Sequence, residues 1–290
     1  MICDLCPRRC HAERTEARGA GFCAMPAGVV AAKAMLHRWE EPCISGARGA
    51  LCVFFTGCNL GCSYCQNGEI SRGNFGKPVS PARLREIFED GIARGAACID
   101  LVTPTHFTPW IAEALAEPLP VPVVWNSGGY ERVETLRTLA GKVQVYLPDL
   151  KYADARLAAA LSDAPDYFET AKAAIDEMYR QTGPYRLGAD GVLQSGVLIR
   201  HMLLPGQLEN TRRVIDYVAA RFPDGGALFS LMSQYTPQKG AAGALARRVT
   251  GAEYRAAVEY LRACGISDGF VQERSSANAA YTPDFDLSGV

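Results

Sequence analysis

The segment CNLGCSYC brings three cysteines within eight residues, with the spacing C-x3-C-x2-C. We call Cys58, Cys62 and Cys65 the cysteine triad. Thiolates are the usual ligands of iron–sulfur clusters, and a [4Fe-4S] cube normally takes four of them. Because no fourth cysteine lies close by in sequence, one iron would keep an open coordination site that can bind and activate a substrate. The alternative is three structural cysteines or part of a zinc site, although zinc usually completes four ligands.

Four further cysteines near the start of the chain form what we call the cysteine quartet. Cys3, Cys6, Cys10 and Cys23 have the spacing C-x2-C-x3-C-x12-C. Four thiolates suit a zinc ion or an iron–sulfur cluster about equally, so the identity of this metal stays open. A small cap without much apolar core would gain most of its order from such a metal. We therefore expect residues 1–48 to form a metal-bound, cysteine-rich cap.

The remaining four of the eleven cysteines lie in apolar contexts, where we expect small core residues: Cys43, Cys52, Cys98 and Cys264. No apolar stretch in the 290 residues approaches the ~20 residues needed to span a bilayer. The chain also begins with cysteines and charges where a secretory signal would place an apolar segment. We therefore expect a cytoplasmic protein without a membrane partner, whose clustered cysteines bind metal rather than form disulfides.

Strand-like and helix-like segments alternate from Leu51 onward, which predicts a parallel sheet, either open or closed into a barrel. Strands are expected at 51–56, 98–103, 121–125, 143–150, 197–204, 228–232 and 269–272. Helices are expected at 81–93, 109–115, 132–139, 167–181, 210–222 and 252–263. Ser80 is a good N-cap for the first of these helices. The tail from Ser275 to Val290 has no clear period.

In parallel α/β folds, chemistry takes place outside the C-terminal ends of the strands. Polar residues of this chain concentrate in five such loops, at 57–66, 104–106, 126–131, 149–151 and around Arg200 and Pro205. The cysteine triad lies in the first loop. Arg200 lies in an otherwise apolar strand, where a charge is costly unless it meets an anion.

The triad follows the first predicted strand, and Tyr64 precedes its last cysteine, an arrangement that resembles the radical S-adenosylmethionine (SAM) superfamily. The segments CPRRC, HRWEEPCISG, FFTGCNLGCSYCQNGEIS, WNSGGYE and YLPDLKY, in this order, are similar to the pyruvate formate-lyase activating enzyme-like branch. The similarity extends from Cys3 to about Pro237. It implies an α/β fold with a partial (β/α)6 barrel at 49–275, the N-terminal cap at 1–48 and a C-terminal tail at 276–290.

The resemblance also implies an activity. The triad would hold a [4Fe-4S] cluster whose fourth iron binds the amino and carboxylate groups of SAM. An electron from the reduced cluster would break the bond between sulfur and the 5′ carbon, and the 5′-deoxyadenosyl radical would abstract hydrogen from a substrate. The electron donor would be an external protein of the flavodoxin or ferredoxin type. The implied substrate is a protein, through the backbone glycine of a glycyl-radical enzyme or through another side chain.

Further residues receive roles from the same resemblance. We expect SAM contacts from ten residues: Tyr64, Thr103, Thr105, His106, Asn126, Ser127, Gly128, Asp149, Lys151 and Arg200. Tyr64 would pack near the adenine. Asp149 and Lys151 lie at i and i+2 of one strand end and point to the same side. Arg200 would meet the SAM carboxylate, and its alternative is a structural ion pair with an acid such as Asp149.

The chain departs from the named branch at several places. Asn126 stands where related activating enzymes carry an aspartate, and Gln234 and Tyr235 stand where they carry a Tyr-His pair. The glycyl-radical activating enzymes also carry ferredoxin-like cysteines after the triad, which this chain lacks.

Two other functions compete with activation of a protein. The first is radical modification of a small metabolite. The second is a non-catalytic zinc or iron–sulfur protein, such as an electron carrier, which predicts no SAM site, or an RNA-binding zinc module. An RNA-binding module predicts a basic surface with stacking aromatics. With 30 Lys and Arg against 31 Asp and Glu, the net charge of -1 gives no general attraction to nucleic acid, so we do not expect a nucleic-acid partner.

Overall fold

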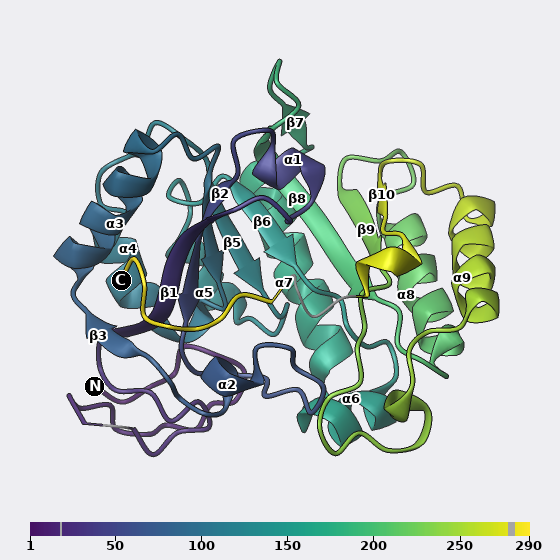
Figure 1. Cartoon of the computed structure of the whole chain (residues 1–290), viewed down its shortest axis with the longest axis horizontal. Coiled ribbons are helices and arrows are strands. Elements are labelled where there is room, and N and C mark those ends of the chain that lie inside the picture. The colour runs from purple at the N-terminus through teal and green to yellow at the C-terminus, as the bar shows by residue number, and fades with distance from the viewer. Residues whose placement is uncertain (18, 278–281) are drawn as a thin grey trace.

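Seven parallel strands form the centre of one sheet in the computed structural model, which describes residues 1–17, 19–277 and 282–290 (Figure 1). These strands, in their order across the sheet, are β10 (Gly269–Val271), β9 (Leu228–Met232), β8 (Leu193–Met202), β6 (Val145–Pro148), β5 (Val123–Ser127), β4 (Ile99–Val102) and β2 (Ala50–Phe55). All neighbouring pairs among them are parallel. The seven predicted strands are therefore confirmed. The sheet ends at β10 on one side, so the predicted barrel is partly closed.

The helices that connect these strands cover the outer face of the sheet (Figure 1). The longer ones are α3 (Pro81–Ala93), α4 (Thr108–Ala114), α5 (Val133–Arg137), α6 (Ala155–Ser162), α7 (Tyr167–Thr182), α8 (Leu208–Arg221) and α9 (Gly251–Ala263). Ser80 accepts a hydrogen bond from the backbone of Arg83, which confirms the predicted N-cap of α3. Thr250 and Glu253 form a reciprocal capping box at the start of α9. Local capping thus fixes where these connecting helices begin.

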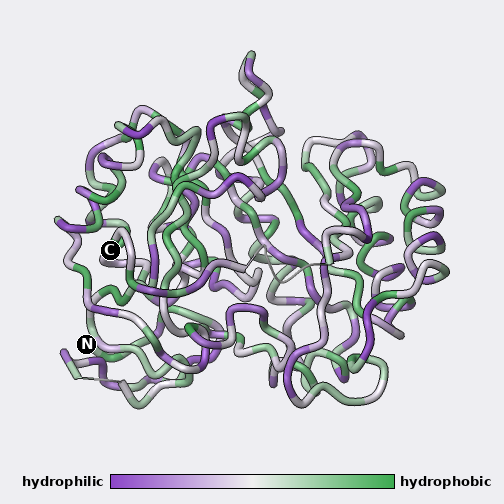
Figure 2. The backbone as a smooth tube through the Cα atoms, in the orientation of Figure 1, coloured by the Kyte–Doolittle hydropathy of each residue, from purple (hydrophilic) through white to green (hydrophobic). Residues whose placement is uncertain are grey.

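Side chains of each central strand alternate between two buried layers, because successive residues of a strand point to opposite faces. Leu51, Val53 and Phe55 of β2 pack in the large core between sheet and helices, whereas Cys52 and Phe54 face the inside of the curved sheet. Figure 2 shows the matching hydropathy, with hydrophobic residues along the central strands and mixed turns in α9. Of the four cysteines expected in the core, Cys43, Cys52 and Cys98 are buried and Cys264 is only partly buried.

The expected cap contains a strand that its sequence does not reveal. Strand β1 (Val29–His37) pairs antiparallel with β2 and with the short edge strand β3 (Lys77–Val79). Most of β1 is buried on both faces, so the apolar–polar alternation of a half-buried strand is missing. Residues 29–37 therefore extend the sheet, and the loops of the expected cap end before them.

Part of the expected C-terminal tail runs beside β1. The backbone N–H groups of Leu287 and Ala34 donate to the carbonyls of Ala32 and Ser288, respectively. Lys33 forms an ion pair with Asp286 at 2.9 Å. Residues 278–281 of the predicted tail lie outside the described residues. The boundaries at 48 and 275 stay predictions, although β1 and β2, on the two sides of the first boundary, pair in the same sheet.

Within the described residues, no helix combines the length and the apolar character that crossing a membrane requires.

Candidate active site

The cysteine triad occupies the loop that leaves the C-terminal end of β2, and all three cysteines line one cavity. Gly57 begins the loop with a φ of 81°, in the region that favours glycine. A Cβ on Gly57 would lie 2.6 Å from the Cγ of Met25, so the loop packs closely against the N-terminal segment. The short helix α2 (Gly68–Ser71) follows, and the carbonyl of its Ile70 accepts a hydrogen bond from the Gly57 N–H. These contacts position the three thiols at the cavity wall.

Each sulfur of the triad accepts a hydrogen bond. In chain order, the donors are the backbone N–H of Leu60 at 3.3 Å, the hydroxyl of Ser162 at 3.1 Å and the hydroxyl of Ser71 at 3.5 Å. None of the three cysteines forms a disulfide. Hydrogen bonds to the sulfurs are one way in which proteins tune iron–sulfur clusters.

Burial, together with the nearby charge of Cys62, raises the pKa of Cys58 to about 12. Burial and the Cys62 charge likewise raise the pKa of Cys65. Thiols in this environment become thiolates only when a cation neutralises them, which a bound metal does. The convergence of three free thiols on one cavity therefore fits a [4Fe-4S] cluster.

Arg200 lies at the centre of a charged network in the same cavity. Its Nε lies 3.0 Å from Oδ1 of Asp149, and its Nη2 donates to Oδ1 of Asn126 at 2.6 Å. Lys151 contacts the other oxygen of Asp149, Oδ2, at 2.5 Å. Burial alone would raise the pKa of Asp149, but the charges of Lys151 and Arg200 outweigh it and hold the pKa below its usual value. The structural ion pair considered as an alternative for Arg200 is thus present.

Two further acids complete this network, and the sequence analysis did not identify them. Glu40 accepts from Nη1 of Arg200 at 3.2 Å, and Asp100 accepts from the amide of Asn126 at 3.2 Å. Burial raises the pKa of Glu40 to about 8 and that of Asp100 to about 6. A signal for Asp100 was available, because it is a charged residue in the apolar run CIDLVT, as Arg200 is in its own strand.

Two predicted SAM residues line the cavity near the triad. The ring of Tyr64 packs edge-on against Tyr152 and Tyr235, and its hydroxyl accepts from that of Tyr152 at 2.9 Å. Thr103 directly follows β4 and has a φ of 61°, a conformation that a β-branched residue rarely adopts. Such strain tends to collect at functional sites, so Thr103 is a marker of this cavity as a site.

The loop after β5 brings Asn126, Ser127 and Gly128 to the same cavity. Gly129 follows with a φ of 75°, and a Cβ there would lie 2.2 Å from the carbonyl oxygen of Asp149. Only glycine fits this close approach of two strand-end loops. Gly129 of the segment WNSGGYE therefore allows the loops after β5 and β6 to pack this closely.

Thr105 and His106 lie outside the cavity, unlike the other eight predicted SAM residues. The chain enters a single turn, η1 (Thr105–Phe107), directly after Thr103 and Pro104, and this turn directs both side chains into the protein wall. Thr105 donates to Glu131 at 2.7 Å, and Nε2 of His106 lies 2.7 Å from the carbonyl oxygen of Thr56. Both residues are 1% exposed. The SAM contacts predicted for them do not fit this placement.

The structure brings the cysteine quartet together beneath the triad loop. Cys3 and Cys6 are buried, Cys23 is partly buried and Cys10 is exposed, and none forms a disulfide. Burial raises the pKa of Cys6 to about 12, and the charges of the other three cysteines add to this effect. The charges of the other three cysteines thus reach Cys6, so the four thiols are neighbours in the N-terminal loops, and a metal shared by them stays a proposal.

Arg8 of the segment CPRRC connects the quartet region to the triad loop. Its guanidinium donates to the carbonyls of Asn59 at 2.8 Å and Leu60 at 3.2 Å, both within the triad loop. It also donates to the carbonyl of Ser162 at 2.6 Å and lies 3.8 Å from the ring centre of Phe22. Ser162 is the residue whose hydroxyl bonds the second sulfur of the triad. One side chain therefore ties the N-terminal loops to two parts of the triad environment.

Comparisons with known proteins agree with this arrangement. The model of the radical SAM superfamily matches residues 52–218, more than half of the chain. A relative in Methanocaldococcus jannaschii, the uncharacterized protein MJ0674, is 28% identical over an alignment of 246 residues, and the match covers 81% of this chain and 66% of that protein. The chain thus spans slightly less than two thirds of that relative.

Solved structures share the fold at low sequence identity. Methylornithine synthase (PylB) has a TM-score of 0.50 and 14% identity, over 74% of this chain and 68% of that chain. SuiB of Streptococcus suis bound to S-adenosylmethionine has a TM-score of 0.50 and 14% identity, over 75% of this chain and 45% of that chain. SuiB bound to its precursor peptide SuiA has a TM-score of 0.52 and 13% identity, over 75% of this chain and 47% of that chain.

The structural likeness shows the fold alone, whereas the family model covers the triad and the strands that surround it. Family membership implies a [4Fe-4S] cluster and SAM, and the three free thiols at one strand-end cavity fit that cluster. The chain belongs to the radical SAM superfamily.

Proposed function

We propose that the chain is an enzyme that cleaves SAM reductively at a cluster held by Cys58, Cys62 and Cys65, and that it abstracts hydrogen from a protein substrate. The observation that carries this proposal is the convergence of three free thiols and the Asp149–Lys151 pair on one cavity. The cluster and SAM supply the electron and the radical when bound, and the protein positions them and excludes water. The chain's own residues divide this work between a cluster wall and a SAM wall.

The cluster wall is the triad loop with the three donors to its sulfurs. Hydrogen bonds to a ligating sulfur orient it and adjust the potential of the metal. Two of the donors are hydroxyls, from Ser71 and Ser162, so replacing them by alanine would change the potential while keeping all three ligands.

The SAM wall consists of the eight predicted residues that line the cavity. Burial lowers the pKa of Lys151, but the Asp149 charge outweighs it and raises the pKa, so Lys151 is a cation that can meet a carboxylate. Arg200 is already bound by Asp149 and Asn126, so we assign it the orientation of Asp149 and give Lys151 the contact with the SAM carboxylate. Thr103 and Gly128 offer backbone groups at the strand ends.

A protein substrate is supported by the similarity of five ordered segments to the pyruvate formate-lyase activating enzyme-like branch. The likeness in fold to SuiB, which has been solved with a precursor peptide, is consistent with it. We assign the external electron donor to the flavodoxin or ferredoxin class on the same resemblance. The quartet would hold zinc or a second cluster as a structural site. Modification of a small metabolite is the competing function.

Electron paramagnetic resonance of the anaerobically reconstituted, reduced protein tests the proposal. Addition of SAM should change the signal of the reduced cluster, because SAM would occupy the open iron. Lys151→Met should weaken this response, and Lys172→Met, which removes a surface cation on α7, should leave it unchanged. If SAM leaves the signal of the reduced cluster unchanged in the natural protein, the proposed function is ruled out. A glycyl or other protein radical appearing in a co-expressed neighbour would identify the substrate.

A further inference from the structure

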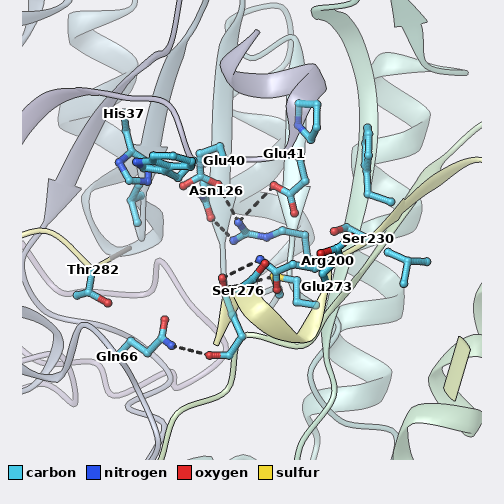
Figure 3. Close-up of a pocket in the computed structure, with 18 of the residues that line it drawn as sticks. His37, Glu40, Glu41, Gln66, Asn126, Arg200, Ser230, Glu273, Ser276 and Thr282 are labelled. Atoms are coloured by element: carbon cyan, nitrogen blue, oxygen red, sulfur yellow. Dashed lines mark hydrogen bonds and ion pairs between the residues drawn. The ribbon is translucent and has the colours of Figure 1, made fainter. Parts of the chain in front are cut away.

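A second cavity, of about 620 Å³, adjoins the triad cavity inside the curved sheet. The two cavities share Asn126, Arg200 and Gln234 in their walls. Three acidic side chains line the second cavity, from Glu40 and Glu41 before helix α1 (Pro42–Ser45) and from Glu273 after β10 (Figure 3). We call this space the acidic cavity.

Negative charge outweighs positive charge among the described residues that line the acidic cavity. Arg200 is the cation of this wall, and it is bound by Asp149, Asn126 and Glu40. His37 also lines the cavity, but burial lowers its pKa, so it is neutral at physiological pH. The space therefore attracts a positively charged ligand.

Glu41 carries the most specific sign of a missing partner. Its side chain is 9% exposed and points toward Arg200 at the cavity wall (Figure 3). Its Oε2 is buried and has no hydrogen-bond partner, and the nearest atom of Arg200, Nη1, lies 3.9 Å away. A buried carboxylate oxygen without a donor is unfavourable, so a ligand that donates hydrogen bonds would stabilise it.

Glu40 gives the same indication. Burial and the charges of Asp100, Glu41 and Asp149 raise its pKa to about 8 despite the opposing charge of Arg200. The carboxyl of Glu40 therefore keeps a proton at neutral pH, and a bound cation would take the place of that proton. Aromatic rings of Trp39, Phe54 and Phe270 line the same space, and ring faces attract organic cations.

We propose that the acidic cavity binds a cationic group of the substrate, an alkylammonium or guanidinium such as the side chain of a lysine or arginine. This inference rests on the proposed function, because the shared wall at Asn126 and Arg200 would hold the substrate beside SAM. A divalent metal is the competing occupant, since ligand atoms of Glu40, Cys52 and Asp100 lie within 4.8 Å of one another. The Glu41 oxygen that lacks a hydrogen bond lies at the cavity wall, outside that group, which favours the organic cation.

Isothermal titration calorimetry on the anaerobically reconstituted protein tests the inference with two probes that have the same four-carbon side chain and differ by the terminal ammonium. N-acetyl-lysine amide carries the ammonium, and N-acetyl-norleucine amide ends in a methyl group. We expect the lysine probe to bind at least tenfold more tightly. Glu41→Gln should reduce this preference to less than threefold. Glu209→Gln removes the same charge from the exposed face of α8 and should leave the preference intact. Glu273→Gln changes an exposed position of the cavity rim and should reduce the preference for the lysine probe by a smaller factor.

Equal binding of the two probes, or a preference that survives both Glu41→Gln and Glu273→Gln, would overturn the inference. One divalent metal per chain that disappears in Cys52→Ser but not in Cys98→Ser would also overturn it, by assigning the negative charge to a metal. SAM cleavage measured on the same samples separates the two proposals. SAM cleavage without a preference for the lysine probe would contradict only the proposed cation site. A preference for the lysine probe without SAM cleavage would contradict only the proposed function.

Discussion

The triad and the quartet are both groups of free cysteines, yet their surroundings differ. The triad follows a central strand, and all three of its sulfurs accept hydrogen bonds at the wall of a cavity. The quartet lies in loops before β1, and one of its cysteines is exposed. Three ligands leave a position for SAM, whereas four fill the coordination of a zinc ion or a cluster. In our proposal, the position in the fold, more than the residue type, therefore separates a catalytic metal from a supporting one.

Removing the quartet metal gives the largest expected effect. The protein with Cys3, Cys6, Cys10 and Cys23 replaced by serine should lose that metal completely and lose hydrogen-exchange protection in residues 1–28. The barrel should stay folded, because it has its own core. Metal analysis identifies the site, since loss of about four irons indicates a cluster and loss of one zinc indicates a structural site. Unfolding of the barrel in this variant would remove the distinction between the two regions.

Arg200→Leu tests whether the Arg200–Asp149 ion pair stabilises the fold around the triad, as we propose that a metal stabilises the fold around the quartet. Removing one partner of a buried ion pair destabilises a fold by about 3–5 kcal/mol. Because Lys151 would still pair with Asp149, we expect a loss toward the lower end of this range. Denaturant unfolding measures this loss. Arg213→Leu is the control, because its pair with Asp154 is partly exposed and worth about 0–1 kcal/mol. A loss no greater than that of the control would show that Arg200 is held for ligand binding and not for the ion pair.

Arg8→Gln tests the contact between the two regions. Arg8 donates to carbonyls of the triad loop, and a hydrogen bond from a charged donor contributes about 1.5–3 kcal/mol. We expect the triad cluster to lose iron several times faster under a chelator while the quartet metal stays bound. Arg9→Gln changes the same residue type at the exposed neighbouring position. Identical rates of iron loss in the two variants would mean that the quartet region does not support the triad.

The smallest effect concerns pH and lies in the barrel. Nδ1 of His201 donates to the carbonyl of Leu150, and Nε2 accepts from Thr211. Burial lowers its pKa from 6.5 to about 4. Since the folded pKa is the lower one, this contribution is complete above pH 6.5 and is lost as the pH falls toward 4. Between pH 7.5 and 5.0 the barrel should lose about 2 kcal/mol from this residue. The free energy of unfolding of His201→Gln, from denaturant curves, should fall by that much less over this pH range than that of the natural protein. An equal fall in the two proteins would contradict the assignment.

Local sequence patterns predicted most of the fold and part of the candidate site. Apolar runs predicted the parallel strands, and Ser80 predicted the start of α3. Strand β1 stayed hidden because both of its faces are buried. The SAM contact predicted for His106 does not fit its buried position, because the turn after Thr103 directs the following side chains into the protein wall. The contact between Arg200 and Glu40 joins residues 160 positions apart, and no spacing in the sequence encodes such a pair.

Production of 5′-deoxyadenosine from SAM under dithionite tests the central claim most directly. The assay compares the natural protein, the triad variant with Cys58, Cys62 and Cys65 replaced by alanine, and the quartet variant. We predict product from the natural protein, none above background from the triad variant, and a reduced but measurable amount from the quartet variant. Equal product from the triad variant would contradict the account. Loss of all product in the quartet variant, with its triad cluster intact, would instead assign electron delivery to the quartet.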